Sequence, residues 1–140
     1  MRQLNVNGCA LLALSPKGDN RGKLIAIETG RDLPFEIARV YYVFDTKEGV
    51  ARGFHAHRAL RQVLIAVSGS CVIAVDDGIH RDDVTLDNPA SALSIDGLVW
   101  REMRDFSSDC VLLVLADRAY DEGDYIRIYS DFVDAVGQLP

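Results

Sequence analysis

Short apolar segments recur along the chain roughly every 8–12 residues, with turn residues between them. This spacing is typical of antiparallel β-sandwiches and barrels. Helical periodicity is almost absent, and one short helix is expected at residues 131–136. The chain is therefore predicted to be all-β. The apolar and β-branched segments expected to form strands are residues 4–6, 10–14, 23–28, 40–44, 61–67, 71–75, 92–95, 99–103 and 110–116.

Two segments lack a strand pattern. The composition of residues 15–22 predicts a loop, and residues 81–86 are polar and weakly patterned. The segment 110–116 is the most hydrophobic of the chain and is expected to be a central strand.

Length and charge limit the number of domains and the kinds of partner that the chain can have. With 140 residues the chain is expected to form a single domain over residues 1–140. A formal net charge of -6 argues against general binding to nucleic acid or to an anionic membrane. No apolar run approaches the roughly 20 residues of a membrane helix. The 3 cysteines are widely spaced, and Cys71 and Cys110 are expected to be buried thiols, which fits a reducing cytoplasm.

Two of the 3 histidines stand one residue apart, in the segment Gly53-Phe54-His55-Ala56-His57-Arg58. Residues i and i+2 of an extended strand point to the same face, so His55 and His57 can project into one space. The remaining histidine, His80, lies in a turn and is expected to be exposed. The pair beside a predicted β-hairpin indicates a functional site.

The segment around the pair resembles the first cupin motif, in which a glycine and H-x-H precede a glutamate and a closing glycine. His55 and His57 fit the pair and Gly69 fits the closing glycine, but Gln62 holds the glutamate position. In the second motif, Arg101 lies near the place where a third histidine would stand. The resemblance implies a cupin jelly roll with an incomplete set of metal ligands.

The flanking segments make the resemblance closer. The segments at residues 34–42, 52–58, 99–103 and 120–127 form an ordered series that is similar to the WxcM-like cupins, in particular their dTDP-4-dehydro-6-deoxyglucose 3,4-ketoisomerases. The resemblance covers about residues 19–132.

This resemblance implies an isomerase without metal or cofactor that moves the ketone of dTDP-4-keto-6-deoxyglucose from C4 to C3 through an enediol. The product would supply an aminotransferase that makes 3-amino-3,6-dideoxysugars for surface glycans such as O-antigen or S-layer glycans. It also implies a homodimer with exchanged N-terminal strands.

The resemblance assigns catalytic roles to three residues. His55 would be the base that takes the C3 proton, and His57 would assist or orient it; an unperturbed histidine pKa of about 6.5 suits this work. Tyr41 would pass a proton between oxygens or carbons. Its neighbour Tyr42 is expected on the opposite face of the strand.

An acidic protein that binds a diphosphate needs local cations, and guanidinium groups grip phosphate oxygens well. Arg52 and Arg101 are the first candidates, followed by Arg21 and Arg39. Gln62 is a further candidate for substrate binding.

Other functions stay open on the sequence. A nucleotide-sugar 3,5-epimerase would use the same fold and a histidine base. A non-catalytic or metal-binding cupin sensor would use the histidines as ligands, since imidazoles suit zinc, iron and nickel. The configuration at C4 of a ketoisomerase product is also open.

Overall fold

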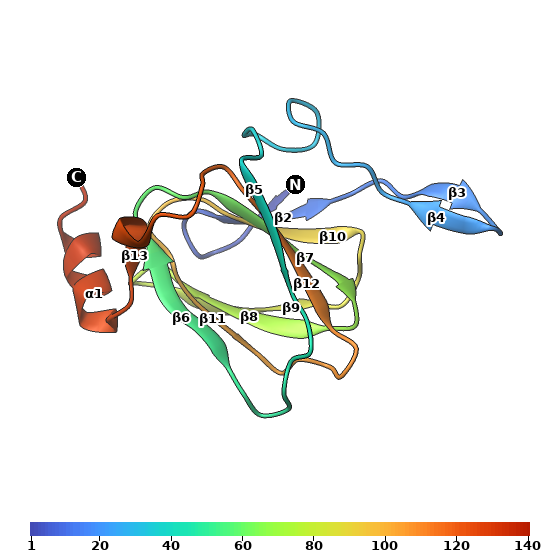
Figure 1. Ribbon diagram of the computed structural model, residues 1–140. Coiled ribbons are helices and arrows are strands. Elements are labelled where there is room, and N and C mark those ends of the chain that lie inside the picture. Colours follow the sequence, from blue (N-terminus) through green and yellow to red (C-terminus); the bar gives the residue numbers. More distant parts are fainter.

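The computed structural model describes residues 1–140, and its strands form two antiparallel sheets that face each other (Figure 1). In order across the first sheet lie β1 (Arg2–Gln3), β2 (Cys9–Ala13), β10 (Ser91–Ile95), β7 (Gln62–Ser68), β12 (Val111–Ala116) and β5 (Arg39–Val43). In order across the second lie β13 (Tyr125–Ile126), β6 (Arg52–His57), β11 (Trp100–Arg104), β8 (Cys71–Asp76) and β9 (Arg81–Leu86). The all-β jelly-roll expectation is confirmed.

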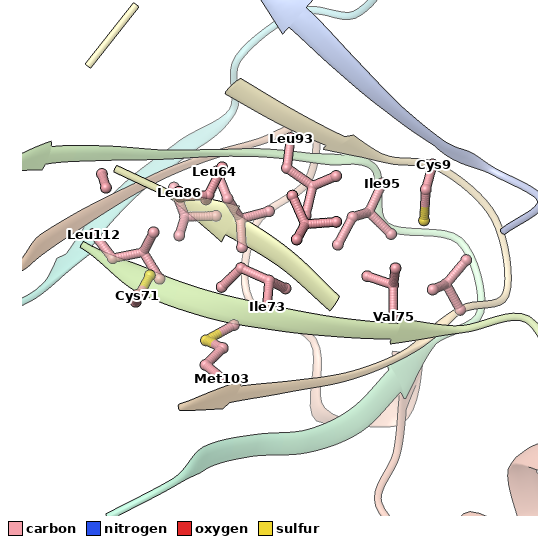
Figure 2. Packing of buried hydrophobic residues seen from close by; sticks show 14 of the residues in the cluster. Cys9, Leu64, Cys71, Ile73, Val75, Leu86, Leu93, Ile95, Met103 and Leu112 are labelled. Atoms are coloured by element: carbon pink, nitrogen blue, oxygen red, sulfur yellow. The ribbon is translucent and has the colours of Figure 1, made fainter. Parts of the chain in front are cut away.

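The main core fills the space between the two sheets. Figure 2 shows apolar side chains from both sheets pointing toward one another, among them Leu64, Leu93 and Leu112 from one and Ile73 and Met103 from the other. Alternation along each strand sends every second side chain into this layer. The apolar segment 110–116 becomes β12, which is paired on both sides and so is an internal strand, as expected.

A second apolar layer covers the outer face of the six-stranded sheet. Val63, Ile65 and Leu115 on this face are buried beneath Leu33 and Phe35 from the segment that precedes β5. On β5 itself the outward side chains of Val40 and Tyr42 remain more than half exposed. Part of this face is therefore apolar and open.

One α-helix, α1 (Tyr129–Gly137), follows a single 3-10 turn, η1 (Glu122–Asp124), near the C-terminus. Figure 1 shows α1 beside β13 and β6. Phe132 is fully buried against Trp100 and Ala56, and the Tyr129 hydroxyl donates to Asp76 at 2.7 Å. The helix thus supports the back of β6. Neither it nor any other helix is long and apolar enough to cross a membrane.

The N-terminal third differs from the sequence prediction. Residues 4–6 are not a strand, because the Leu4 amide donates to the Cys9 carbonyl and closes a turn between β1 and β2. The predicted loop 15–22 contains β3 (Lys17–Asp19), and the predicted strand 23–28 shortens to β4 (Gly22–Leu24). These two strands form a hairpin that projects away from the sheets (Figure 1).

Three further strands were not predicted, the first being the two-residue β1. The weakly patterned segment 81–86 is β9, in which Val84 and Leu86 are buried and the alternate residues stay in solvent. β13 has only two residues, too few for a pattern to reveal. The predicted helix at 131–136 is present and slightly longer.

Candidate active site

A β-bulge sets the direction of the histidine pair. In the pairing of β6 with β11, His55 lies opposite Arg101 and Gly53 lies opposite Glu102, so Phe54 is an extra residue between them. Gly53 has φ of 93° and Phe54 has φ of 53°, both in the left-handed region. Positive φ is uncommon for a bulky residue, so the bulge is a strained feature placed directly before His55.

His55 and His57 point together into the space between the sheets, as the H-x-H spacing predicts, while Ala56 packs outward near α1. Their ring centroids are 4.9 Å apart in an edge-to-face arrangement. Tyr125 of β13 packs against both rings at a tilt, with centroids 5.1 Å from His55 and 4.3 Å from His57. His57 is 1% exposed, whereas His55 is partly exposed.

Asp124 holds His57 in one orientation, and sequence reasoning did not identify it. The His57 Nδ1 lies 3.1 Å from Asp124 Oδ2, and the same carboxylate accepts the backbone amides of Ala59 and Leu60. A carboxylate only accepts, so Nδ1 carries the proton and Nε2 keeps its lone pair. That Nε2 is buried and has no protein partner.

Tyr41, Gln62 and Arg101 form a hydrogen-bonded series across the other side of the site. Arg101 Nη1 donates to Gln62 Oε1 at 2.6 Å, and Gln62 Nε2 donates to the Tyr41 hydroxyl at 3.0 Å. Arg101 Nη2 also donates to the Val99 carbonyl at 2.9 Å. Tyr41 and Gln62 come from the six-stranded sheet and Arg101 from the five-stranded sheet, so this series joins the two sheets.

Burial and the Arg101 charge keep both imidazoles neutral. Burial, followed by the charge of the nearby Arg101, lowers the pKa of His55 to about 4 and that of His57 to about 2. Burial also lowers the pKa of Arg101 to about 10, which leaves it charged at neutral pH. Burial raises the pKa of Tyr41, while its bond from Gln62 and the charge of Arg101 act in the opposite direction. The site therefore offers two free imidazole bases and one protonated phenol.

The arginine candidates fall into different places. Arg39 lies at the edge of the site, with its guanidinium 5.0 Å from the Tyr41 ring centroid and 5.7 Å from that of Tyr120. Arg101 is 0% exposed, so it has no surface with which to hold a diphosphate. Arg52 is exposed at the start of β6. Arg21 is exposed on the projecting hairpin, where it pairs with Asp19 at 2.7 Å.

The other candidates are placed as follows. Tyr41 faces inward and Tyr42 is 61% exposed, which matches the predicted alternation. Gln62 is 1% exposed and bonded at both ends, so it supports Tyr41 and Arg101 and does not face a ligand. His80 is exposed, as expected.

The residues present do not form a metal site. No group of three His, Cys, Asp or Glu side chains is arranged to hold a metal ion. Arg101 pairs with His55 across β6 and β11, and its charge, which acts on both histidines, opposes a second cation beside them.

The family model that matches the chain is described as FdtA: WxcM-like, C-terminal, and it matches residues 7–137. A curated relative is the TDP-4-oxo-6-deoxy-alpha-D-glucose-3,4-oxoisomerase of Aneurinibacillus thermoaerophilus. It is 52% identical over 121 residues, which are 86% of this chain and 87% of the relative.

Solved structures agree with this match. A 3,4-ketoisomerase from Thermoanaerobacterium thermosaccharolyticum, solved as a histidine-to-asparagine variant in complex with TDP-4-keto-6-deoxyglucose, has a TM-score of 0.92 and 41% identity. The match covers 94% of this chain and 96% of that one. A TDP-quinovose 3,4-ketoisomerase from Campylobacter jejuni has a TM-score of 0.89 and 47% identity, covering 92% and 99% of the two chains.

Proposed function

The chain belongs to the WxcM-like family, and we propose that it is a sugar-nucleotide 3,4-ketoisomerase acting on TDP-4-keto-6-deoxyglucose. The observation that carries this proposal is the site itself. Two neutral histidines and a protonated tyrosine surround one space, and a buried, charged guanidinium lies close to them. Such a set suits proton transfer without a metal or cofactor.

Moving a ketone from C4 to C3 requires two kinds of proton transfer. A base takes the C3 proton, and the C–H electron pair forms a C3–C4 double bond while the C4 oxygen receives a proton. The resulting enediol then loses the proton of its C3 oxygen, and C4 receives a proton from the protonated base. Atoms balance because the carbons exchange one proton and the oxygens exchange another.

We assign the carbon protons to His55 and the oxygen protons to Tyr41. His55 has a neutral ring that is partly exposed, so a sugar can reach it. His57 is held by Asp124 and fixes the arrangement of the pair. A positioned base of this kind contributes roughly 10²–10⁴ to the rate.

Arg101 supports the negative charge that develops on the enediol oxygens. Its guanidinium is buried with only neutral oxygens as hydrogen-bond partners. A fixed positive charge in a water-poor site stabilises a developing oxyanion without reorganisation. This role replaces the diphosphate contact that the sequence suggested for it. Arg39 at the edge of the site is the best placed cation for the diphosphate, and Arg52 is a further candidate.

We further propose that residues 1–140 act as one domain and that two copies form a homodimer with exchanged N-terminal strands. The support is the partly open apolar face of the six-stranded sheet and the hairpin of β3 and β4 that leaves the body of its own chain. In such a dimer Arg21 on the hairpin would reach the partner's site. The buried, unpaired cysteines fit the cytoplasm as the place of action.

Product identification tests the proposal against its alternatives. Incubation with TDP-4-keto-6-deoxyglucose should give a 3-keto sugar, seen by carbon NMR as a carbonyl at C3. A product that keeps its C4 ketone and has an inverted C5 would assign a 3,5-epimerase. Stoichiometric metal in the purified protein, with binding of the nucleotide sugar in calorimetry and no product, would assign a metal-binding sensor.

A further inference from the structure

Side-chain chemistry determines which group donates and which accepts in the hydrogen bonds that join Arg101, Gln62 and Tyr41. A guanidinium has donors only, so the Gln62 atom 2.6 Å from Arg101 Nη1 is the amide oxygen. The amide nitrogen then faces Tyr41, 3.0 Å from its hydroxyl oxygen. Because an amide nitrogen only donates, the Tyr41 oxygen is the acceptor in this bond, and the phenolic proton points elsewhere.

The surroundings hold Gln62 in this orientation. Gln62 is 1% exposed and Arg101 is 0% exposed, so no bulk water reaches either group. Arg101 is anchored a second time by the Val99 carbonyl at 2.9 Å. A half-turn of the Gln62 amide would place its NH₂ group against the guanidinium and leave donors facing donors.

We propose that Gln62, held by Arg101, is a positioning residue that turns the Tyr41 hydroxyl proton toward the sugar and so makes Tyr41 the proton donor to the C4 oxygen. This inference rests on the proposed ketoisomerase function. After Tyr41 gives up its proton, the phenolate keeps the Gln62 bond and lies near the Arg101 charge. The hydroxyl proton of the C3 oxygen then returns to Tyr41, which restores the starting state.

The two proton transfers become separable if Gln62 acts through Tyr41. Exchange of the C3 proton with solvent depends on His55 and can proceed through the enediolate, whose charge Arg101 supports, before Tyr41 gives its proton to the C4 oxygen. Formation of the 3-keto product needs that transfer. A change at Gln62 is therefore expected to slow product formation more than it slows C3 exchange.

The direct test is Gln62→Glu, which has nearly the same shape but reversed polarity. The glutamate carboxylate accepts hydrogen bonds from both neighbours. The Tyr41 hydroxyl therefore donates to it and no longer points toward the sugar, and the negative charge of the glutamate neutralises that of Arg101. The expected result is a loss in kcat of roughly 10² or more with KM nearly unchanged. Gln138→Glu, an exposed site near the C-terminus, is the matched control and keeps the wild-type kcat.

Repeating the change in a Tyr41→Phe background separates positioning from folding. Gln62→Glu is expected to cause little further loss there, because the hydroxyl on which it acts is gone. An equal fold loss in both backgrounds would overturn the proposal, as would wild-type kcat in Gln62→Glu. Gln62→Met, which removes the donor without adding a charge, provides a second variant if the glutamate fails to fold.

A measurement without substrate tests the positioning role of Gln62 separately from the proposed ketoisomerase function. Ultraviolet absorbance of phenolate, taken as the difference from Tyr41→Phe, follows the titration of Tyr41 alone. Gln62→Glu and Gln62→Met should both move this titration to higher pH, and an unmoved titration would overturn the positioning role. Failure of the wild-type protein to make a 3-keto sugar would instead overturn the proposed function.

Discussion

At the scale of single residues, the charge of Arg101 and the burial of its neighbours decide the state of the site. A protonated His55 or His57 would place a second cation beside a guanidinium that has no carboxylate hydrogen-bond partner. Both imidazoles therefore stay neutral across the physiological range. A neutral imidazole is the form that can accept a proton from carbon.

The pH dependence of kcat/KM reports the lowered pKa of His55. The free base of His55 is needed, and its pKa is lowered to about 4, so activity should fall only as the pH drops through about 4. Arg101→Gln removes one of the causes and should move this acid limb to higher pH. An acid limb near the ordinary histidine value of about 6.5 in the wild type would contradict the account.

Asp124 should matter for rate more than for substrate binding. Asp124→Asn can donate to His57 Nδ1, which favours the tautomer with the proton on Nε2 and turns the lone pair away from the site. The expected loss in kcat is roughly 10²–10⁴, with a small change in KM. Asp77→Asn is a matched control, since Asp77 also accepts backbone amides and contacts a histidine, His80, in an exposed turn.

Kinetics and circular dichroism on both variants check this prediction. If Asp77→Asn lowered kcat as much as Asp124→Asn, the loss would reflect general destabilisation. The orienting role of Asp124 would then be unsupported.

Sequence reasoning identified the histidine pair and the inward Tyr41 because alternation in a strand is a local property. Asp124 was missed because its place depends on the pairing of Tyr125 with His57, between residues far apart in the chain. The burial of Arg101 likewise depends on three strands that meet around it. Sequence patterns give residue type and face, but they do not give long-range neighbours.

At the scale of elements, the strained bulge in β6 sets the direction of the His55 side chain. Gly53 and Phe54 both have positive φ, and His55 follows directly. Bulges bend a strand and re-aim the side chains beyond them. The H-x-H pattern predicted a regular strand here and carried no sign of this extra residue.

Gly53→Ala should damage both stability and activity. Its φ is 93°, and a Cβ there would lie 3.1 Å from the Arg101 carbonyl oxygen. The expected loss is about 1–3 kcal/mol in the free energy of unfolding, with reduced kcat because β6 shifts against β11. Gly97→Ala is the matched control: its φ is 92°, but its Cβ would meet nothing within 4 Å.

Urea unfolding and steady-state kinetics on the two variants separate the effects. Gly97→Ala should lose stability from backbone strain alone and keep its kcat. Equal kcat losses at the two positions would contradict a special role for the bulge.

At the scale of the whole molecule, the two sheets have unequal outer faces. The five-stranded sheet is backed by α1, whereas the six-stranded sheet presents apolar residues that its own chain covers only in part. Large exposed apolar areas mark protein interfaces. The sequence predicted the sheets but not which outer face stays open. The exposure of Tyr42 depends on how much of the six-stranded sheet the segment before β5 covers.

The proposed dimer can be tested on this face. Tyr42 is 61% exposed and Val67 is 44% exposed, so the double change Tyr42→Lys and Val67→Lys should shift the protein toward monomer in sedimentation velocity. Ile79→Lys replaces an even more exposed apolar residue, in the turn between β8 and β9, and should leave the dimer intact. A monomeric wild type, or a double variant that stays dimeric, would contradict the assignment of this face.

The measurement that tests the central claim most directly is proton NMR of TDP-4-keto-6-deoxyglucose in deuterated water, with wild-type protein and His55→Asn side by side. We expect the wild type to remove the C3 proton signal and to form a 3-keto product with deuterium at C4. We also expect His55→Asn to bind the nucleotide sugar but to do neither. Unchanged C3 exchange and turnover in His55→Asn would contradict the assigned base, and an intact C3 signal with the wild type would contradict the ketoisomerase reaction itself.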